Sequence, residues 1–502
     1  MAGRNRFRGD GLSEARSSVC RSLAMERQAG MTTEYLHGVE TIEVSDGIRP
    51  VRRVRTSVVS VTGTAPDADP DVFPLNRPVI IAGNTRLAAQ LGRAGTLYDS
   101  VAAVYQQIGA IVSVVRVDTG MTADATLANV VGDPITKTGI FAHLSAQSLT
   151  GIKPKLHTAA GWTSARPTTG IREIQVTEGG EGYTSAPTVV ITPANGTAAI
   201  AVVQGGTVQT VIVTAPGLGH TAAPAITFTG GGGSDAAATA IVGTTANPAA
   251  VSLASLADRT RGFGFADGPN TSNDAAISYR GDFGSDRLMV IDPHVLAYDT
   301  TIAANVARPA SAYAAGLQSK MDNERGFWWP FSNQVINGVT GVSRPIEANL
   351  SDRNSEHNWL NENEITTIIR DNGFRFFGLR SCSGDPATAF MSVRRIIDVV
   401  RDEVEAAFTW ALDRPFSQQL VREIIESVNA YLRLLKTEGA IVGGTAWLNP
   451  DFNPASNLMD GKLTIDFDIE PVAPIERLTF RIHRNPDYYT DAVEEIVRAI
   501  AA

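Results

Sequence analysis

Cysteine is nearly absent from this chain of 502 residues, which holds only Cys20 and Cys382. Two cysteines cannot form a disulfide framework, and the lack of a C-x-x-C pair removes a common thiolate spacing for zinc. The seven histidines show neither H-x-x-x-H nor H-x-H spacing. We therefore predict that the chain has no metal site.

Long apolar runs are missing as well. No stretch of ~18 apolar residues occurs, so we expect no membrane insertion. The formal net charge of −9 and the pI of about 5.4 argue against a surface that binds nucleic acid. A hydrophobic fraction of 43% is enough for a sizeable core, and the length suggests about three domains.

Nucleotide-binding and catalytic signatures are also absent. The best candidate loop for a ligand reads FADGPNTSN, at residues 265–273. It lacks both G-x-G-x-x-G and G-x-x-x-x-G-K-[ST], so its amides could not cradle a phosphate, and Asp267 and Asn270 are interpreted as turn residues. No G-x-S-x-G elbow occurs either. We predict that the chain is not an enzyme and holds no cofactor.

What the sequence does contain is an alternation of strand and helix patterns. Residues 78–83 (PVIIAG) predict a strand, and residues 97–117 predict a helix that runs into a strand. Residues 262–293 predict strand, turn, helix and strand, with Thr271 and Asp274 spaced as a capping box. Such alternation implies a mainly parallel sheet with helices on both faces, which is an α/β fold.

Residues 171–243 differ from their surroundings, because they are rich in Gly, Ala, Thr and Val and hold no lysine. The run IREIQVTEGGEGYTSAPTVVIT recurs as VQTVIVTAPGLGHTAAPAITFT at an offset of 37 residues, and TAAIAVV recurs as AAATAIV two residues later than that offset predicts. Each unit predicts three strands, so two units predict an inserted all-β repeat domain. Its role is either an exposed decoration that binds glycans or an inert spacer, since Tyr183 and Phe228 make only a thin aromatic platform.

The amino-terminal part of the chain has two sections. Residues 1–30 hold six arginines and three acids without apolar periodicity, and we interpret them as a disordered basic leader. Residues 31–65 predict an extended N-terminal arm made of two extended runs around a turn. The apolar positions of this arm are Val39, Ile42, Val44, Val51 and Val54.

The last third of the chain predicts an α+β arrangement. Two strands turn at Asp371-Asn372-Gly373, and two amphipathic helices follow, separated at Pro415, with Gly439 as the stop after the second. Acidic pairs in the expected helices are interpreted as solvated faces: Glu403 with Glu405, and Glu494 with Glu495.

Residues 461–482 alternate around a proline-bearing turn and predict an antiparallel hairpin. The first strand has an apolar face and the second carries further apolar positions: Leu463, Ile465, Phe467 and Ile469, then Leu478, Phe480 and Ile482. A two-stranded ribbon alone is only marginally stable in water, so this hairpin needs a partner.

Several blocks of the chain resemble contractile tail sheath proteins, in particular those of R-type pyocins and temperate myophages. The blocks are FADGPNTSNDAAISYRGDFGSDRLMVIDP, RPASAYAAGL, GFWWPFSNQVINGVTGVSRPIE and IIRDNGFRFFGLRS, at residues 265–293, 308–317, 326–347 and 368–381. Residues 37–69 resemble the amino-terminal arm of these proteins, and residues 453–482 resemble their carboxyl-terminal end. The likeness runs in order from about Met31 to the end, interrupted by the repeat segment.

The resemblance implies an architecture for the whole chain. An α/β sheath core domain would comprise residues 66–165 and 245–355, with the all-β repeat domain inserted at 171–243. An α+β polymerisation domain that ends in the terminal hairpin would comprise residues 356–502.

The resemblance also implies a mechanical function. Sheath subunits form hexameric rings that stack helically around an inner tail tube, and contraction after baseplate triggering drives the tube through a cell envelope without consuming nucleotide. Terminal arms add strands to a sheet in the neighbouring subunit's carboxyl-terminal domain, which is a form of β-augmentation. The residues expected in this strand exchange are Val39, Ile42, Val44, Val51, Val54, Leu463, Ile465, Phe467, Ile469, Leu478, Phe480 and Ile482.

The expected partners are further copies of the chain, the inner tail tube protein, the baseplate and the tail terminator. The expected location is the tail of a virion or a tailocin particle, assembled in the bacterial cytoplasm. Two other classes remain as alternatives: a surface-exposed adhesive or glycan-binding β-repeat protein, which would leave the α/β part unexplained, and an α/β enzyme, for which no catalytic constellation is present.

Overall fold

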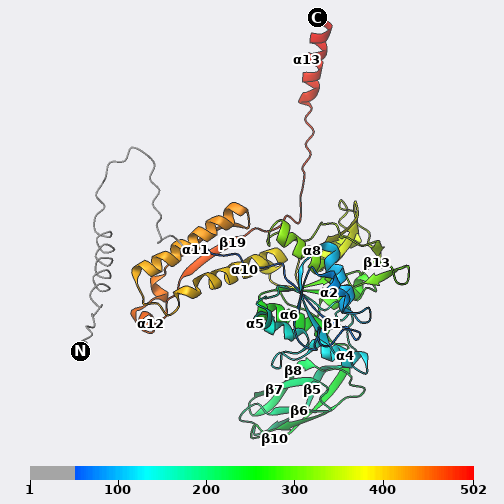
Figure 1. Cartoon of the computed structure of the whole chain (residues 1–502), viewed down its shortest axis with the longest axis vertical. Coiled ribbons are helices and arrows are strands. Elements are labelled where there is room, and N and C mark those ends of the chain that lie inside the picture. The colour runs from blue at the N-terminus through cyan, green and yellow to red at the C-terminus, as the bar shows by residue number, and fades with distance from the viewer. Residues whose placement is uncertain (1–50, 502) are drawn as a thin grey trace, which may run out of the picture. The chain divides into compact units, whose positions relative to one another are not determined.

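The computed structural model describes residues 51–501, and its core is a sheet of eight strands (Figure 1). These strands are β1 (Val59–Thr64), β2 (Val79–Ala82), β3 (Ile111–Val117), β4 (Leu156–Thr158), β11 (Phe263–Asp267), β12 (Leu288–Ile291), β16 (Ile365–Arg370) and β17 (Phe374–Phe377). Their order is β17-β16-β12-β11-β4-β1-β3-β2. Neighbours pair in parallel from β16 to β3, and the edge strands β2 and β17 pair antiparallel. The predicted mixed α/β fold with a mainly parallel sheet is therefore confirmed.

Strand β1 corrects the expected end of the N-terminal arm. We expected the arm to run to residue 65, but Val59–Thr64 lie between β3 and β4 and all six residues are buried. A run of Val and Thr is typical of a strand that is covered on both faces. An extended arm can have the same run, so the sequence could not show where the arm ends and β1 begins. Any arm therefore ends before Val59.

Helices cover both faces of this sheet. On β3, Val112 and Val114 pack into one hydrophobic cluster, whereas Val115 and Val117 pack into the other, as the alternation of side chains requires. The first cluster receives α2 (Thr85–Ala89), α3 (Leu97–Gln107) and α8 (Ser311–Glu324). The second receives α4 (Ala123–Val131), η1 (Gly139–Ser145), α6 (Pro248–Thr260) and α7 (Asn273–Arg280). The short helix α5 (Ala146–Thr150) follows η1.

Two local predictions can be compared with the structure. The turn after β16 is confirmed, because Asn372 and Gly373 adopt φ angles of 49° and 114° and join β16 to β17. The predicted capping box is wrong by one residue. Ser272, and not Thr271, caps α7, since its hydroxyl accepts a hydrogen bond from the amide of Ala275 at 3.2 Å.

The strands β16 and β17 also correct a boundary. We expected the carboxyl-terminal domain to begin at residue 356, yet β16 pairs in parallel with β12 and extends the core sheet. The remaining elements near this edge are β13 (Val295–Asp299), β14 (Ala304–Arg308), β15 (Gly341–Val342), α9 (Glu356–Glu362) and η2 (Pro386–Thr388). The polypeptide thus leaves the core sheet only after residue 377.

Two buried histidines are bonded to strands of the core sheet, His157 from β4 and His143 from η1. Both ring nitrogens of His157 lie 2.7 Å from hydroxyls, those of Ser60 and Thr260, and the ring nitrogens of His143 lie 3.1 Å from the hydroxyls of Ser113 and Thr62. Burial lowers the pKa of His143 to about 3 and also lowers the pKa of His157 well below its ordinary value. Both rings are therefore neutral and structural.

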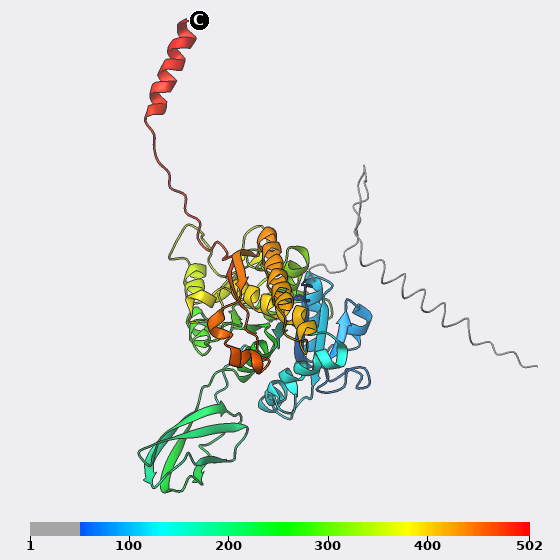
Figure 2. The ribbon, with the colours of Figure 1, turned by 90° about the vertical axis from the view of Figure 1, so that its left-hand side faces the viewer.

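The inserted segment folds as a closed barrel of six strands, which we call the repeat barrel (Figure 2). The first unit forms β5 (Gly170–Glu181), β6 (Thr188–Thr192) and β7 (Thr197–Gln204), and the second forms β8 (Thr207–Pro216), β9 (Ala225–Thr229) and β10 (Ser234–Gly243). Each unit thus forms the three strands that the repeat predicted. The order around the barrel is β10-β5-β8-β7-β6-β9.

The repeat barrel has its own core and a short connection to the α/β part. Its ends are adjacent, because Gly170 pairs with Gly243. The loop after β8 contacts the rest of the protein: Leu218 packs against the second core cluster, and the amide of Gly219 donates to the hydroxyl of Thr169 at 3.1 Å.

The carboxyl-terminal part begins with two long amphipathic helices, as predicted. Its elements are α10 (Met391–Phe408), η3 (Thr409–Ala411), α11 (Gln418–Glu438), β18 (Ile441–Trp447), η4 (Pro450–Phe452), α12 (Ala455–Met459), β19 (Asp466–Pro471) and α13 (Asp487–Ala501). Helix α11 ends at Gly439, whose φ of 82° is the left-handed conformation that glycine adopts readily.

Candidate polymerisation surface

Strands β18 and β19 form a separate antiparallel sheet of two strands. Within residues 51–501, neither strand has a second neighbour on its other side. One face of this sheet packs on α10 and α11 through a cluster that includes Val400, Val428, Leu432 and Leu435. The sheet is thus supported from one face while both of its edges are open.

This pairing corrects the predicted terminal hairpin. The partner of β19 is β18 and not the segment after the proline turn, because α11 returns the chain beside β19 and Pro471 and Pro474 interrupt the run that follows. Leu478, Phe480 and Ile482 lie in no strand and are 69%, 82% and 93% exposed. The predicted second strand therefore has no partner strand among residues 51–501.

The faces assigned to the first strand agree with the structure. Ile465, Phe467 and Ile469 pack against the helix cluster, whereas Asp468 and Glu470 are exposed. Leu463, on the same face, is half-buried. The role of these residues in strand exchange stays a prediction.

A groove adjoins β19. It has a volume of about 390 Å³ and lies between this strand and α10. Its lining is apolar except for one cation and one anion: Ile397, Arg401, Val404, Glu405, Phe467 and Ile469. An extended segment placed here could bond to the β19 backbone and bury apolar side chains against α10.

The described start of the chain packs on the same helices. Val51 and Val54 contact the helix cluster, and the amide of Val54 donates to a carboxylate oxygen of Glu403 at 2.9 Å. Arg53 forms ion pairs with Glu403 and with Glu438. Val39, Ile42 and Val44 lie outside the described residues.

Glu403 corrects our interpretation of the acidic pair on α10. We expected a solvated face, but the Glu403 side chain is 0% exposed and accepts a hydrogen bond from the hydroxyl of Tyr431. Burial raises the pKas of both groups, and the neighbouring Glu403 carboxylate raises that of Tyr431 further. Glu405, in contrast, has a side chain that is 61% exposed.

The carboxyl-terminal segment leaves this region after one anchor. Arg380 makes two hydrogen bonds to the carboxylate of Glu476, at 2.8 and 2.7 Å. Beyond it the chain is extended, and α13 has no buried residue (Figure 1). The exposed apolar side chains of α13 recur at helical spacing and include Tyr489, Val493, Ile496, Val497 and Ile500.

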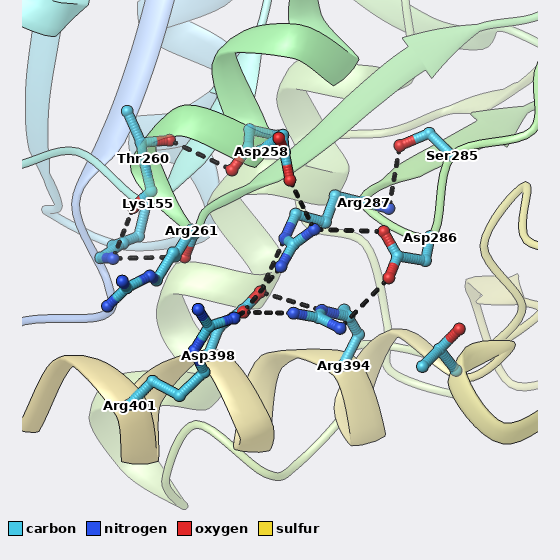
Figure 3. Close-up of polar contacts among 12 residues, drawn as sticks. Lys155, Asp258, Thr260, Arg261, Ser285, Asp286, Arg287, Arg394, Asp398 and Arg401 are labelled. Atoms are coloured by element: carbon cyan, nitrogen blue, oxygen red, sulfur yellow. Dashed lines mark hydrogen bonds and ion pairs between the residues drawn. The ribbon is translucent and has the colours of Figure 1, made fainter. Parts of the chain in front are cut away.

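An ion-pair network joins α10 to the α/β core (Figure 3). Arg287, which precedes β12, donates two hydrogen bonds of 2.8 Å to Asp398 of α10. Arg394 binds the same carboxylate at 2.7 Å, and Asp258 of α6 binds Arg287 at 2.9 Å. Burial opposes ionisation of Asp398, but the hydrogen bonds from the two arginines hold its pKa below the ordinary value.

A second group of charges lies one turn farther along α10. Lys155 forms an ion pair with Asp402 and donates to the carbonyl oxygens of Thr260 and Arg261, at 2.7 and 3.2 Å. Arg261 reaches both Asp402 and Glu405, at 3.1 and 2.6 Å. Burial lowers the pKa of Lys155 to about 8. Sequence patterns missed both groups, because charges that alternate along an amphipathic helix look the same whether they face water or another domain.

The described residues contain no group of three or more His, Cys, Asp or Glu side chains that could hold a metal ion. Across the same part of the chain, no helix combines the length and the apolar character that crossing a membrane requires.

Two family models match the chain. The model described as phage tail sheath protein central domain matches residues 232–382, and the phage tail sheath C-terminal domain matches residues 383–485. The chain is 32% identical over 475 residues to the tail sheath protein of Escherichia phage P2, covering 92% of this chain and 99% of that protein. It is 33% identical over 489 residues to the tail sheath protein of Burkholderia phage BcepMu, covering 91% of this chain and 98% of that protein.

Solved structures give the same result at the level of the fold. The helical sheath of the anti-feeding prophage in its contracted state aligns with a TM-score of 0.56 at 16% identity, covering 90% of this chain and 100% of that one. The sheath complex of an extracellular contractile injection system, PVC, in its contracted state aligns with a TM-score of 0.54 at 15% identity, covering 91% and 100%.

The alternative of an adhesive or glycan-binding β-repeat protein finds no support in these comparisons, because the two phage tail sheath proteins named above match over nine-tenths of the chain. The chain belongs to the family of contractile phage tail sheath proteins.

Proposed function

We propose that this chain is the structural subunit of a contractile tail sheath that polymerises around an inner tail tube, and that contraction of the polymer drives the tube through a cell envelope. The observation that carries the proposal is the two-stranded β18–β19 sheet, which is open at both edges and bordered by an apolar groove. Open strand edges are templates for pairing with another chain. A sheet of two strands also gains stability when further strands join it.

The segment after β19 has the properties of a donated strand. Leu478, Phe480 and Ile482 alternate with polar residues and are exposed in their own subunit. When this segment lies beside β19 of a neighbouring subunit, the apolar side chains fill the groove and the backbone groups pair, which is β-augmentation. Charge favours the same partner, because the segment carries Arg477 and Arg481 while β19 exposes Asp468 and Glu470.

The open edge of β18 is the proposed acceptor for the amino-terminal arm of another subunit. Residues 31–50 carry the apolar positions Val39, Ile42 and Val44, of which Ile42 and Val44 have the two-residue spacing of one strand face. Val51 and Val54 have a different role, since they pack on the helices of their own subunit and fix the base of the arm. Each subunit would then donate two strands and accept two.

Helix α13 completes the carboxyl-terminal arm in this proposal. Its apolar face is exposed, and a donated arm would place that face against a neighbouring subunit. An isolated helix of about 15 residues is only marginally stable in water, so such a contact would also stabilise the helix itself.

The proposal includes the assembly that such an exchange builds. Subunits form hexameric rings stacked helically around the tube, and the ends of the polymer contact the baseplate and the tail terminator. The particle is the tail of a virion or a tailocin, assembled in the bacterial cytoplasm. The role is mechanical and not catalytic, since the energy of contraction is stored in the polymer.

Truncation of the arm tests the proposal. A chain that ends at Pro471 should fold, with a thermal unfolding transition close to that of the full chain, but should form no tubes by negative-stain electron microscopy. A matched chain that ends at Asn485 keeps the strand segment and lacks only α13, so it should still form tubes at higher concentration. Normal tubes from the chain that ends at Pro471 would contradict strand exchange through this arm.

A further inference from the structure

One side of the repeat barrel exposes a cluster of aliphatic side chains. Val190 on β6, Ile200 and Val202 on β7, and Ile212 on β8 are 37%, 54%, 39% and 49% exposed. They are contiguous, because these strands are neighbours and Ile200 pairs directly with Ile212. We call this surface the aliphatic face. None of its three strands contains a charged residue.

The charges of the repeat barrel lie on other strands. Arg172, Glu173, Glu178 and Glu181 belong to β5, and Asp235 begins β10. Strand β9 has no charge, and with most of β10 it exposes small side chains: Ala225, Thr227, Ala237 and Thr239. We call this second surface the small-residue face. In the closed ring of strands, β10 lies opposite β7, so Thr239 and Ile200 at the centres of the two faces look in opposite directions, while the faces adjoin where β6 pairs with β9.

The internal duplication shows that the fold does not require the aliphatic face. By the repeat offset Ile200 corresponds to Thr239, and Ile212 corresponds to Gln175. These polar residues pair with each other on the opposite side, as Ile200 and Ile212 do. The same backbone positions therefore accept polar side chains in one half of the barrel and expose aliphatic ones in the other. Exposed apolar surface that folding does not need is a mark of an interaction site.

The shape of the barrel limits how it can bind. Closure of the ring leaves no free strand edge, so the repeat barrel cannot add a strand as the β18–β19 sheet can. Any association must bring side-chain faces together. A bulky aliphatic face and a flat face of Ala and Thr are complementary in shape, and neither presents charge that would have to be desolvated.

We propose that the aliphatic face of one repeat barrel packs against the small-residue face of the repeat barrel on a neighbouring copy of this chain. The inference rests on the proposed function, since the polymer places identical barrels at fixed spacing. Subunits related by rotation and translation along a polymer meet through two different surfaces, and two faces on opposite sides of one barrel satisfy that requirement. The high effective concentration in the polymer lets even a small contact form.

Cross-linking tests the contact in the full chain. The double variant Ile200→Cys/Thr239→Cys, in a Cys20→Ser background, should give a ladder of disulfide-linked dimers, trimers and larger species when assembled sheaths are oxidised. The two thiols lie on opposite sides of one barrel and cannot join within it. Each single variant should give no ladder, and neither should Ile200→Cys/Thr221→Cys, whose second thiol lies in the exposed loop between β8 and β9.

Assembly provides an independent measurement. Ile200→Glu/Ile212→Glu should raise the critical concentration for sheath formation roughly tenfold, which corresponds to ~1.4 kcal/mol for each added subunit. Thr221→Glu/Ala222→Glu also places two new carboxylates side by side on the barrel, but in the exposed loop between β8 and β9, and should leave the critical concentration unchanged.

The outcomes separate the two proposals. Sheaths that assemble without a disulfide ladder, or that are indifferent to Ile200→Glu/Ile212→Glu, would overturn the barrel contact while leaving strand exchange intact. Loss of binding to cells with unchanged assembly would likewise overturn it, in favour of a receptor surface. If the unmodified chain forms no polymer, the proposed function fails and this inference fails with it.

Discussion

The repeat barrel and the β18–β19 sheet are two β structures in one chain that treat their strand edges in opposite ways. The barrel closes six strands on themselves and has its own hydrophobic core. The β18–β19 sheet has two strands, two open edges and a groove beside one of them. A closed barrel is stable independently of its neighbours, whereas an open sheet depends on them. Both properties occur in this one subunit, in different places.

The open sheet can depend on other chains because its supporting helices are fixed to the core of its own subunit. Two charged groups clamp α10, one around Asp398 and one around Asp402. Force that reaches β18 and β19 would therefore pass to the α/β core through buried ion pairs as well as through apolar contacts.

Breaking this clamp should have the largest effect. Asp398→Ala leaves Arg287 without its main partner, and since that arginine's side chain is only 8% exposed, we expect a loss of about 3–5 kcal/mol in the free energy of unfolding. Urea denaturation of the unassembled subunit measures it. Glu405→Ala is the matched control on the same helix, and its exposed pair should contribute ~1 kcal/mol or less. Equal losses would show that the Asp398 group is not a clamp.

Removing the packed face of the open sheet should have the next largest effect. Phe467→Asp places a charge against the cluster beneath β19 and also inside the groove, so we expect a loss of ~2–3 kcal/mol together with loss of tubes. Thr464→Asp changes an exposed position nearby and should be tolerated in both measurements. A variant of Phe467 that still forms normal tubes would show that the groove is not an acceptor.

The core sheet is a third case, because its six inner strands have neighbours on both sides. Acid should test the stability of the polar groups that are buried against it. The pKa of His143 is about 3 in the folded protein, so the unfolded chain binds the extra proton between about pH 6.5 and 3. The neutral His143 makes its full contribution to the free energy of unfolding above pH 6.5, and this contribution is lost as the pH falls toward 3. At pH 5 the loss in the free energy of unfolding amounts to about 2 kcal/mol.

The measurement for this acid effect is the difference in unfolding free energy between pH 7 and pH 5. His143→Gln should lower stability at both values, because it disturbs the pairs with Ser113 and Thr62. Between pH 7 and pH 5, the variant should also lose less free energy of unfolding than the unmodified chain does. An unchanged pH dependence would mean that His143 becomes protonated without unfolding.

Sequence patterns predicted the parts of the fold that depend on local periodicity and turn chemistry. The parallel sheet, the two long helices, the turn at Asn372-Gly373 and the six strands of the duplicated segment could all be predicted. Hydrophobic alternation also placed Ile465, Phe467 and Ile469 on the packed face.

Partners between distant segments could not be predicted in the same way. Apolar residues alternate on both sides of Pro471 and Pro474 whether the second segment pairs with β19 of its own chain or with another chain. The prediction of a terminal hairpin was therefore wrong. Glu403 and Asp398 follow helical spacing like solvated acids, and only the packing of α10 on other elements shows that they are buried. Which distant segments contact each other is determined by tertiary packing, and local sequence patterns do not contain that information.

Excision of the repeat barrel should have the smallest effect on the rest of the subunit. Gly170 and Gly243 are paired neighbours, so a short Gly/Ser linker spans the gap that the folded barrel spans now, and each doubling of loop length costs only about 0.6 kcal/mol. The main loss is the contact of half-buried Leu218 with the core, which contributes about 1 kcal/mol. The excised chain should therefore unfold within a few degrees of the full chain, and it should still form tubes because strand exchange remains. Its critical concentration should rise as it does for Ile200→Glu/Ile212→Glu, since both changes remove the same barrel contact. A subunit that fails to fold after excision would show that the closed barrel is not the independent module that its topology indicates.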